Sequence, residues 1–267
     1  MALAHHICIR LANNSLLAPT PAARRVLARA ILARAGAVEL LAFSLADNHL
    51  HLLAACPRVA AGELARRVEL SLCRSLAPGA PFSRAFVKPV EDGWHLYQCF
   101  RYVHRQPERH GIAVDPLREA SNLPDLLGLR PLGAATAATV RRHLPRIHRP
   151  ELLALLGVPS LEPVDGALEH VVEAALAASA VPALTGRPHE VLSARRAALA
   201  VIGRRCSPRQ AALLLGVGER ALFRLKQLPA DARLVQAIRR QLHLIAQRAA
   251  APQGFVADAA VGGDRSA

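Results

Sequence analysis

Several residue classes are scarce in this chain, and each scarcity excludes a class of protein. Only one Trp, two Tyr and six Phe occur in 267 residues, which argues against a base-stacking platform like that of single-strand-binding proteins. No uncharged apolar run reaches the roughly 18 residues of a membrane span, and the first residues do not resemble a signal peptide. The five cysteines have no C-x-x-C spacing, so we expect reduced, mostly buried thiols. These absences predict a cytoplasmic protein without a membrane partner.

Acidic residues are also few compared with basic residues. Lys and Arg together number 34, against 20 Asp and Glu, which gives a net charge of +14 at pH 7. Such an excess favours a polyanionic partner, usually nucleic acid. Because only Lys88 and Lys226 are lysines and Ala is abundant, a GC-rich coding bias contributes to the arginine excess. The sign of the charge is therefore more informative than its size.

The first part of the chain alternates strand patterns with helix patterns. The predicted elements are a strand at His6–Leu11, a helix from Pro21 to Gly36 with Thr20 as N-cap, a hairpin of Val38–Leu45 and His49–Ala55, a helix at Gly62–Leu76, a strand at Ser83–Val90, and a helix at Gly93–His104 that Pro107 ends. This order predicts an α+β fold, a ferredoxin-like sandwich with a mostly antiparallel sheet and helices on one face.

The pattern changes after this part of the chain. Prolines punctuate short Leu- and Ala-rich segments that carry no strand signal, and a basic helical region follows them. We predict a catalytic domain at residues 1–118, a helical connector at 119–182, an all-α DNA-binding region at 183–250 and a disordered tail at 251–267.

His49, Leu50 and His51 open the second strand of the predicted hairpin. Residues i and i+2 of a strand point to the same face, so the two imidazoles lie side by side and suit one metal ion. Twelve histidines in 267 residues would give about 0.5 such pairs by chance. The spacing alone is therefore weak, and two half-exposed strand histidines are the plainer alternative.

A tyrosine and a glutamine share one face of the third predicted helix. Tyr102 and Gln106 are four residues apart, and Tyr97 is the only other tyrosine. A tyrosine beside a metal-binding pair is a candidate nucleophile for a phosphodiester, because the metal polarises the phosphoryl oxygen. The amide oxygen of Gln106 would add a third, hard ligand that suits Mg²⁺ or Mn²⁺. The alternative is that Tyr102 simply packs on the sheet.

The segments 45–53 (LADNHLHLL) and 101–111 (RYVHRQPERHG) together resemble the HUH single-tyrosine transposases, most closely the REP-associated tyrosine transposases. The resemblance covers about residues 5–112. It implies a ferredoxin-like HUH domain with Mg²⁺ or Mn²⁺ on His49, His51 and Gln106. Many members of this subgroup have Asn at the position of Gln106. It also implies that Tyr102 forms a 5′-phosphotyrosine link to single-stranded or hairpin DNA, in a nucleoid-associated homodimer or monomer.

A second DNA-binding signal lies in the basic region. Ser207 is predicted to cap a helix, with Pro208 at its first position and Gln210 completing a capping box. The following residues resemble a helix-turn-helix in which Gly216 takes the turn, and the alternative is a plain α-hairpin with a solvated basic face. The predicted contacts to duplex DNA are Arg209, Glu219, Arg220, Phe223, Arg224 and Gln227, with Arg195, Arg196, Arg204, Arg205, Arg239 and Arg240 placed for phosphates.

Together these features predict a DNA transposase-like single-strand endonuclease and strand transferase. One alternative is a catalytically silent DNA-binding regulator that uses a hairpin-binding module and the helix-turn-helix. Another is a metal-dependent nuclease that uses water in place of Tyr102. A covalent DNA–protein adduct would separate the three.

Overall fold

The computed structural model describes residues 2–109, 117, 119–147, 152 and 161–250. Its first part alternates strands and helices, as predicted, although the ends of the elements differ by a few residues. The bounds are β1 Ala4–Arg10, α1 Pro21–Leu32, β2 Glu39–Leu45, β3 His49–Ala55, α2 Arg58–Leu76 and β4 Phe86–Val90.

The four strands form one antiparallel sheet in the order β2-β3-β1-β4. The predicted hairpin of β2 and β3 is confirmed, since Phe43 pairs with Leu52 and the Ala46 N–H donates to the His49 carbonyl at 3.0 Å. On its other side β3 pairs with β1, where Cys8 lies opposite His51. The predicted α+β class with an antiparallel sheet is confirmed.

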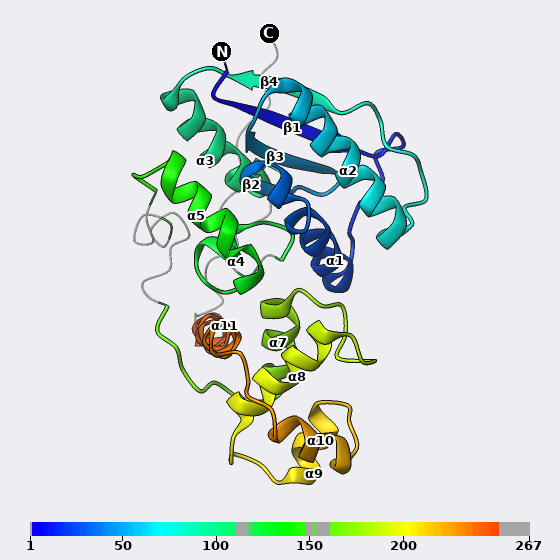
Figure 1. The fold of residues 1–267 in the computed structure, drawn as a ribbon, viewed down its shortest axis with the longest axis vertical. Helices are drawn as coiled ribbons and strands as arrows, with labels where there is room; N and C mark the ends of the chain where they lie inside the picture. The colour runs from blue at the N-terminus through cyan, green and yellow to red at the C-terminus, as the bar shows by residue number, and fades with distance from the viewer. Residues whose placement is uncertain (1, 110–116, 118, 148–151, 153–160, 251–267) are drawn as a thin grey trace, which may run out of the picture.

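Helices cover both faces of this sheet (Figure 1). On one face, α1 and α2 share a hydrophobic cluster with Ile7 and Leu52. On the other face, α3 (Gly93–Arg109) and α5 (Ala134–His143) pack against β2, whose Leu41 belongs to a second cluster. The prediction of helices on one face only is therefore wrong. The sequence carried a signal of this, because β2 is a nearly continuous apolar run, which is typical of a strand buried on both faces.

The start of α1 follows the predicted capping pattern. Thr20 Oγ1 accepts a hydrogen bond from the Ala23 N–H at 3.1 Å, and Pro21 takes the first helical position, where its missing N–H costs no helical hydrogen bond. The helix ends at Leu32 and not at Gly36, because a short 3₁₀ turn occupies the residues before β2.

The helix α3 continues beyond its predicted end. It runs through Pro107 to Arg109, so the prediction that Pro107 ends it is wrong. A proline has a φ angle that suits a helix, although it lacks an N–H donor and its ring crowds the carbonyl four residues earlier. Pro107 therefore removes one helical hydrogen bond without ending the helix within the described residues.

A short segment after α3 lies along the outer edge of β2. The Leu45 N–H donates to the Ala120 carbonyl at 2.9 Å, and the Asn122 N–H donates to the Phe43 carbonyl at 3.1 Å. The Asn122 side chain, which is fully buried, also accepts from the Phe43 N–H and donates to the Leu41 carbonyl. This edge of the sheet is therefore paired by a segment that is not itself a regular strand.

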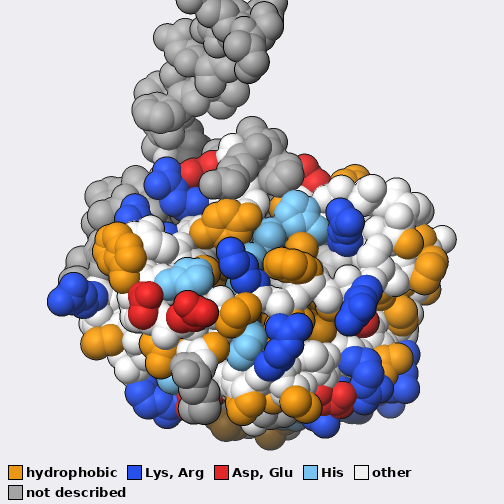
Figure 2. Space-filling view, turned by 90° about the horizontal axis from the view of Figure 1, so that it is seen from above, with side chains coloured by type: hydrophobic (Ala, Val, Ile, Leu, Met, Phe, Trp, Pro, Cys, Tyr) orange, Lys and Arg blue, Asp and Glu red, His pale blue; other side chains and the backbone are white. Residues whose placement is uncertain are grey.

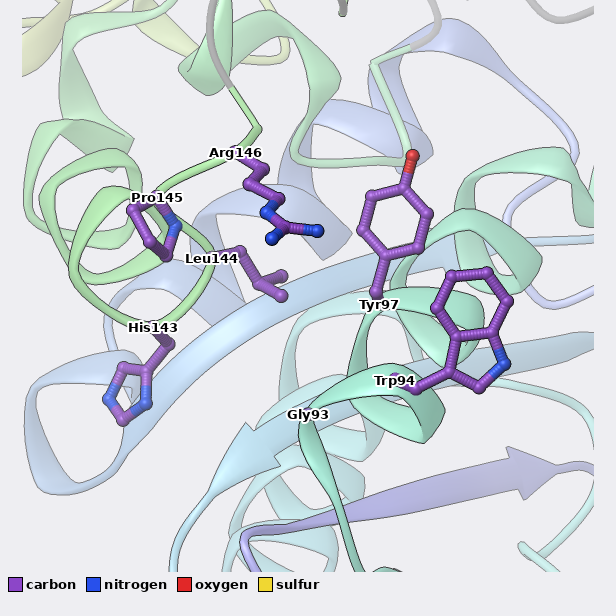
Figure 3. A pocket seen from close by; sticks show the side chains of 7 residues that line it. All are labelled: Gly93, Trp94, Tyr97, His143, Leu144, Pro145 and Arg146. Atoms are coloured by element: carbon purple, nitrogen blue, oxygen red, sulfur yellow. The ribbon is translucent and has the colours of Figure 1, made fainter.

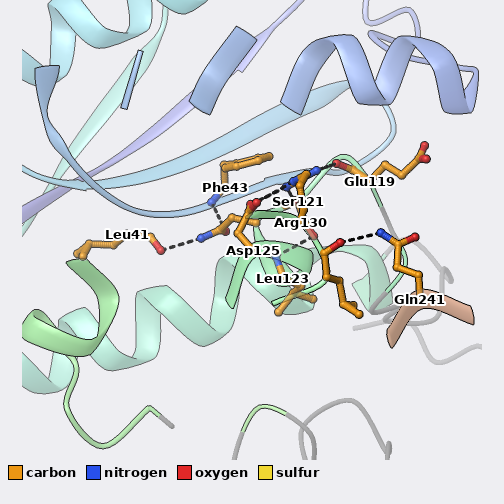
Figure 4. Close-up of polar contacts among 10 residues, drawn as sticks. Leu41, Phe43, Glu119, Ser121, Leu123, Asp125, Arg130 and Gln241 are labelled. Carbon is orange, nitrogen blue, oxygen red and sulfur yellow. Dashed lines mark hydrogen bonds and ion pairs between the residues drawn. The ribbon is translucent and has the colours of Figure 1, made fainter. Parts of the chain in front are cut away.

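A buried arginine organises the residues that follow (Figure 4). Arg130 is 1% exposed and forms an ion pair with Asp125 at 2.6 Å. Its guanidinium also donates to the carbonyls of Glu119 and Ser121. This network fixes α4 (Leu123–Leu126) and the turn after it beside the sheet.

The remaining described elements are helical and form a third hydrophobic cluster below the sheet (Figure 1). The prediction of a disordered tail at 251–267 lies outside the described residues. No helix within the described ranges has the length and hydropathy needed to cross a bilayer. The helices are α7 Val171–Ser179, α8 His189–Ile202, α9 Pro208–Leu214, α10 Glu219–Lys226 and α11 Ala232–Ala250.

The long helix α11 connects this lower part to the sheet. Gln241 is buried, and its Nε2 donates to the Leu129 carbonyl at 2.8 Å (Figure 4). Arg240 donates to the Gly128 carbonyl, and Leu244 joins the cluster beneath α3. The two parts of the chain therefore share a packed interface.

Candidate functional site

The strand β3 presents two histidines on one face of the sheet. His49 and His51 point toward α3, while Leu50 between them is fully buried against the opposite helices. The ring centroids of the two histidines are 4.6 Å apart, with the rings nearly perpendicular. The side-by-side imidazoles follow from strand geometry, as the sequence predicted.

Tyr102 is brought to this pair by α3. Its ring lies edge-on to that of His51, with the centroids 5.7 Å apart. The helix is held there by Phe100 and Val103, which are fully buried against the sheet. Tyr102 itself is half-buried at the border between that apolar face and the surface. Two segments that are distant in the sequence therefore meet at one point, with a phenol beside two imidazoles.

His6 is a third histidine at this point, and sequence reasoning assigned it no role. Its Nε2 lies 2.9 Å from His51 Nδ1, and the two rings are stacked with centroids 5.0 Å apart. Its ring is also edge-on to Tyr102. The signal that could have found it is the strand pattern of β1, because Cys8 pairs with His51 and His6 lies two residues away on the same face.

Burial controls the charge of His6. Desolvation, together with the nearby positive charge of Lys88 and of His95, lowers the pKa of His6 from 6.5 to about 4. The imidazole is therefore neutral at pH 7 and can accept a hydrogen bond from His51. A neutral ring is also the form that stacks on His51 without charge repulsion.

The hydrogen bonds of the pair indicate which ring nitrogens could bind a metal. His49 Nδ1 lies 2.8 Å from Asn48 Oδ1, and because an amide oxygen only accepts, Nδ1 carries the proton. When His51 Nδ1 donates to His6, the second histidine has the same tautomer. In both rings a metal would then be bound through Nε2, with Nδ1–H held by a second residue, as in many metal sites.

Gln106 lies one helical turn after Tyr102 and is 3% exposed. The amide oxygen of Gln106 is a hard ligand that suits Mg²⁺ or Mn²⁺, whereas imidazole more often binds transition metals. Among the residues described, no group of three or more His, Cys, Asp or Glu side chains is placed to hold a metal ion. The predicted ligands His49, His51 and Gln106 include only two side chains of those types, so this finding does not test them.

A pocket of about 440 Å³ lies against α3 beside the tyrosine. Its described lining consists of Gln98, Arg101, Tyr102, Arg105 and Glu108. Arg105 forms an ion pair with Glu108 at 2.7 Å, and both side chains are largely exposed. Two guanidinium groups beside a phenol form a surface on which a phosphate can bind. Viewed from the β4 end of the molecule, histidine, basic and hydrophobic side chains lie close together (Figure 2).

His104, which also lies near the tyrosine in sequence, has a different environment. It is 1% exposed and packs edge-on to Phe100 with centroids 4.6 Å apart. Neither of its ring nitrogens has a hydrogen-bond partner among the described residues. Burial lowers the pKa of His104 to about 3, so the ring is neutral and part of the core. A contact to phosphate is excluded by this burial.

The residues predicted to contact duplex DNA lie in the lower part of the molecule, away from the sheet (Figure 1). Ser207 caps α9 with the predicted capping box, and Gly216 takes the turn with a φ of +60°. Leu222 and Leu225 of α10 are buried, which turns the opposite face of the helix to solvent. All six predicted contact residues are exposed: Arg209, Glu219, Arg220, Phe223, Arg224 and Gln227.

Most of the six arginines predicted to contact DNA phosphates are less available for that role than predicted. Arg195 is buried and donates to the carbonyls of Leu184 and Gly186, so its predicted phosphate contact is wrong. The reason is that this face of α8 is internal, and the guanidinium satisfies the carbonyls of the loop before the helix. Arg239 forms an ion pair with Asp165 at 3.0 Å. Three others also donate to main-chain carbonyls: Arg196, Arg205 and Arg240.

Comparisons with protein-family models, with curated proteins and with solved structures found no match for this chain. Function is therefore inferred from the side chains and contacts described above.

Proposed function

We propose that this chain is a single-strand DNA endonuclease and strand transferase of the HUH single-tyrosine type, acting on hairpin-forming DNA. The position of Tyr102 supports this most strongly, since its ring lies 5.7 Å from that of His51 although the two come from separate elements. A candidate nucleophile beside two imidazoles is an arrangement that suits metal-assisted attack on a phosphodiester.

In the proposed reaction, the Tyr102 oxygen attacks the scissile phosphorus and loses its proton to water. The new O–P bond forms as the bond from phosphorus to the 3′ oxygen breaks, and that oxygen takes up a proton. One strand then ends in a 3′-OH, and the other stays attached through its 5′ phosphate. Because one phosphodiester is exchanged for another, a second 3′-OH can reverse the step and join strands without ATP.

The surrounding residues would bind the metal and the phosphate and orient the ring of His51. A divalent ion on His49, His51 and Gln106 would polarise the phosphoryl oxygen. Arg101 and Arg105, at the pocket beside Tyr102, would bind the flanking phosphate oxygens. His6 would hold the ring of His51 in orientation through their 2.9 Å contact.

Two features outside the site support a DNA substrate. The order of elements, strand-helix-strand-strand-helix-strand, is that of a ferredoxin-like sandwich, the fold implied by the resemblance. The pair α9 and α10, joined by a short turn at Gly216, is consistent with a helix-turn-helix whose second helix enters a major groove. We propose that the chain acts at the nucleoid as a homodimer or a monomer, with α10 binding duplex DNA beside the cleaved strand.

A covalent adduct on a denaturing gel tests the proposal. The full chain is incubated with Mg²⁺ or Mn²⁺ and end-labelled hairpin oligonucleotides, and mass spectrometry locates the attachment. We expect an adduct on Tyr102, which Tyr102→Phe abolishes while hairpin binding persists, because only the phenolic oxygen is removed. Tyr97→Phe is the matched control and should keep the adduct.

The other outcomes separate the alternatives. Hairpin binding without cleavage by the wild type would favour the catalytically silent regulator. Cleavage without an adduct, retained in Tyr102→Phe, would favour a nuclease that uses water. An adduct that is lost only in Tyr97→Phe would assign the nucleophile to the other tyrosine.

A further inference from the structure

A second pocket lies at the start of α3, away from the histidine pair. It has a volume of about 530 Å³, within the range typical of small-ligand sites. One wall is the first turn of α3 and the other is the loop after α5 (Figure 3). The lining residues are Gly93, Trp94, Tyr97, His143, Leu144, Pro145 and Arg146.

Two aromatic rings are stacked at this pocket. Trp94 and Tyr97 come from successive turns of α3, with centroids 5.9 Å apart and planes 24° from parallel. Trp94 is 71% exposed, so most of an indole faces solvent. The low aromatic content of the chain predicted no base-stacking surface, yet two of its nine aromatic residues are stacked here. Composition averages over the chain and does not report such a local pair.

One arginine lines this pocket, and a second arginine contacts its aromatic pair. Arg101 Cζ lies 5.7 Å from the centre of the Tyr97 ring, and Arg146 extends toward the same ring from the opposite wall (Figure 3). His143 forms its hydrogen bond with Glu39, outside the lining. At the start of the helix, Asp92 accepts from the His95 N–H as an N-cap. An aromatic face between two guanidinium groups suits a flat base carried on an anionic backbone.

The pocket and the proposed site are both formed in part by α3. Arg101 contacts Tyr97 and lines the pocket beside Tyr102 as well. Tyr97 and Tyr102 are separated by five residues, which is about 7.5 Å of helical rise and about 140° of rotation, so the two side chains leave different sides of α3. A single strand bound at both places would therefore pass around α3 by way of Arg101, with the base and the phosphate in different nucleotides of that strand.

We infer that the Trp94–Tyr97 pocket binds an unpaired nucleobase of single-stranded DNA, in the strand whose phosphate is presented to Tyr102. The inference rests on the proposed function for its choice of DNA, but base binding does not need cleavage. A double helix keeps its bases stacked on one another, so the pocket would select single strands over duplexes.

Fluorescence provides a direct test, because Trp94 is the only tryptophan in the chain. The Tyr102→Phe protein is titrated with a short single-stranded oligonucleotide, with the same length of abasic phosphodiester and with single-stranded RNA. We expect the DNA to quench Trp94 and the abasic chain to quench it much less. Equal quenching by the abasic chain, no quenching at all, or quenching by RNA alone would each overturn the inference.

Affinity provides the second measurement, with a labelled oligonucleotide. Trp94→Ala should weaken single-strand binding about 5- to 150-fold, the range for loss of one stacking ring, while Trp94→Phe recovers part of it. Phe86→Ala, which removes another exposed aromatic ring, is the control and should bind as the parent does. Since Trp94 is largely exposed, these variants should fold, which circular dichroism checks.

The two proposals can fail separately. An adduct on Tyr102 without quenching of Trp94 would overturn this inference and leave the proposed reaction intact. Quenching with a stacking-dependent affinity but no adduct would leave a single-strand-binding pocket and remove the strand transferase.

Discussion

Each histidine of β3 is expected to be required for cleavage, because a metal held by three ligands loses much of its affinity when one is removed. We expect His49→Ala and His51→Ala each to abolish cleavage of a hairpin substrate. EDTA should do the same to the wild type, and added Mn²⁺ should restore it. Hairpin binding, measured by gel shift, should persist in both variants.

The matched control is His189→Ala, which removes an exposed imidazole at the start of α8. It should cleave as the wild type does. Undiminished cleavage in EDTA would show that the reaction needs no metal on His49 and His51.

The buried His104 makes stability depend on pH. Its pKa is lowered from 6.5 to about 3 by burial, so on acidification the unfolded chain binds a proton that the folded protein does not. The free energy of unfolding therefore falls as the pH decreases through this window. Between pH 7.5 and 5 the wild type should lose about 2 kcal/mol more than His104→Leu, measured by urea unfolding.

The exposed His189 again supplies the comparison. His189→Leu should retain the acid sensitivity of the wild type, because its imidazole is solvated in both states. An equal loss of stability in His104→Leu and the wild type would mean that His104 takes up its proton in the folded protein.

At the scale of elements, α10 should contribute to duplex binding and not to cleavage. Arg220 and Arg224 are exposed on the face opposite its buried leucines. Arg220→Ala combined with Arg224→Ala should weaken binding to duplex-containing DNA and reduce the salt slope by about 0.9 log unit per lost phosphate contact. Cleavage of a minimal hairpin should be unchanged.

A second double variant is the control for the loss of positive charge alone. Arg67→Ala with Arg74→Ala removes the same charge from exposed positions of α2. It should leave duplex affinity near that of the wild type. An equal loss of affinity in the two double variants would make α10 part of a general positive surface and not a recognition helix.

The elements of the sheet were largely predictable from local chemistry. The turn after β2, the Thr20 cap and the capping box of α9 depend on neighbouring residues, and their predictions are confirmed. The continuation of α3 through Pro107 was not predictable in this way, since a proline inside a helix costs a hydrogen bond without always ending the helix. The role of Asn122 was also hidden, because its partners in β2 are distant in the sequence.

The candidate site was predictable only in part for the same reason. The spacing of His49 and His51 indicates one face of a strand, and this orientation is observed. The position of His6 beside His51 can be predicted only from the register of β1 against β3, and no local sequence pattern specifies that register. The stacked pair of Trp94 and Tyr97 lies at helical spacing and could have been noticed, but the low aromatic content concealed it.

At the scale of the whole molecule, Arg130 is expected to be a major stabilising residue. Arg130→Met would leave Asp125 buried without its partner, which typically costs about 3–5 kcal/mol. The expected result is a loss of this size in the free energy of unfolding, measured by chemical denaturation. Since the network lies between the sheet and α11, both parts should unfold together.

A surface ion pair provides the contrast. Arg142 pairs with Glu39, and the two side chains are 63% and 45% exposed. Arg142→Met should therefore cost at most about 1 kcal/mol. Similar losses in the two variants would mean that Asp125 finds another partner or a proton when Arg130 is absent.

Both edges of the sheet are closed to a further strand. The β2 edge is paired with the segment at Ala120 and Asn122. On the β4 edge, Pro89 has no N–H to donate, Lys88 is exposed, and Arg58 donates to the Val87 carbonyl. Open edges invite pairing with other chains, and proline and lysine oppose it. The sheet thus resists aggregation, and a homodimer of this chain would have to form through its helices or loops.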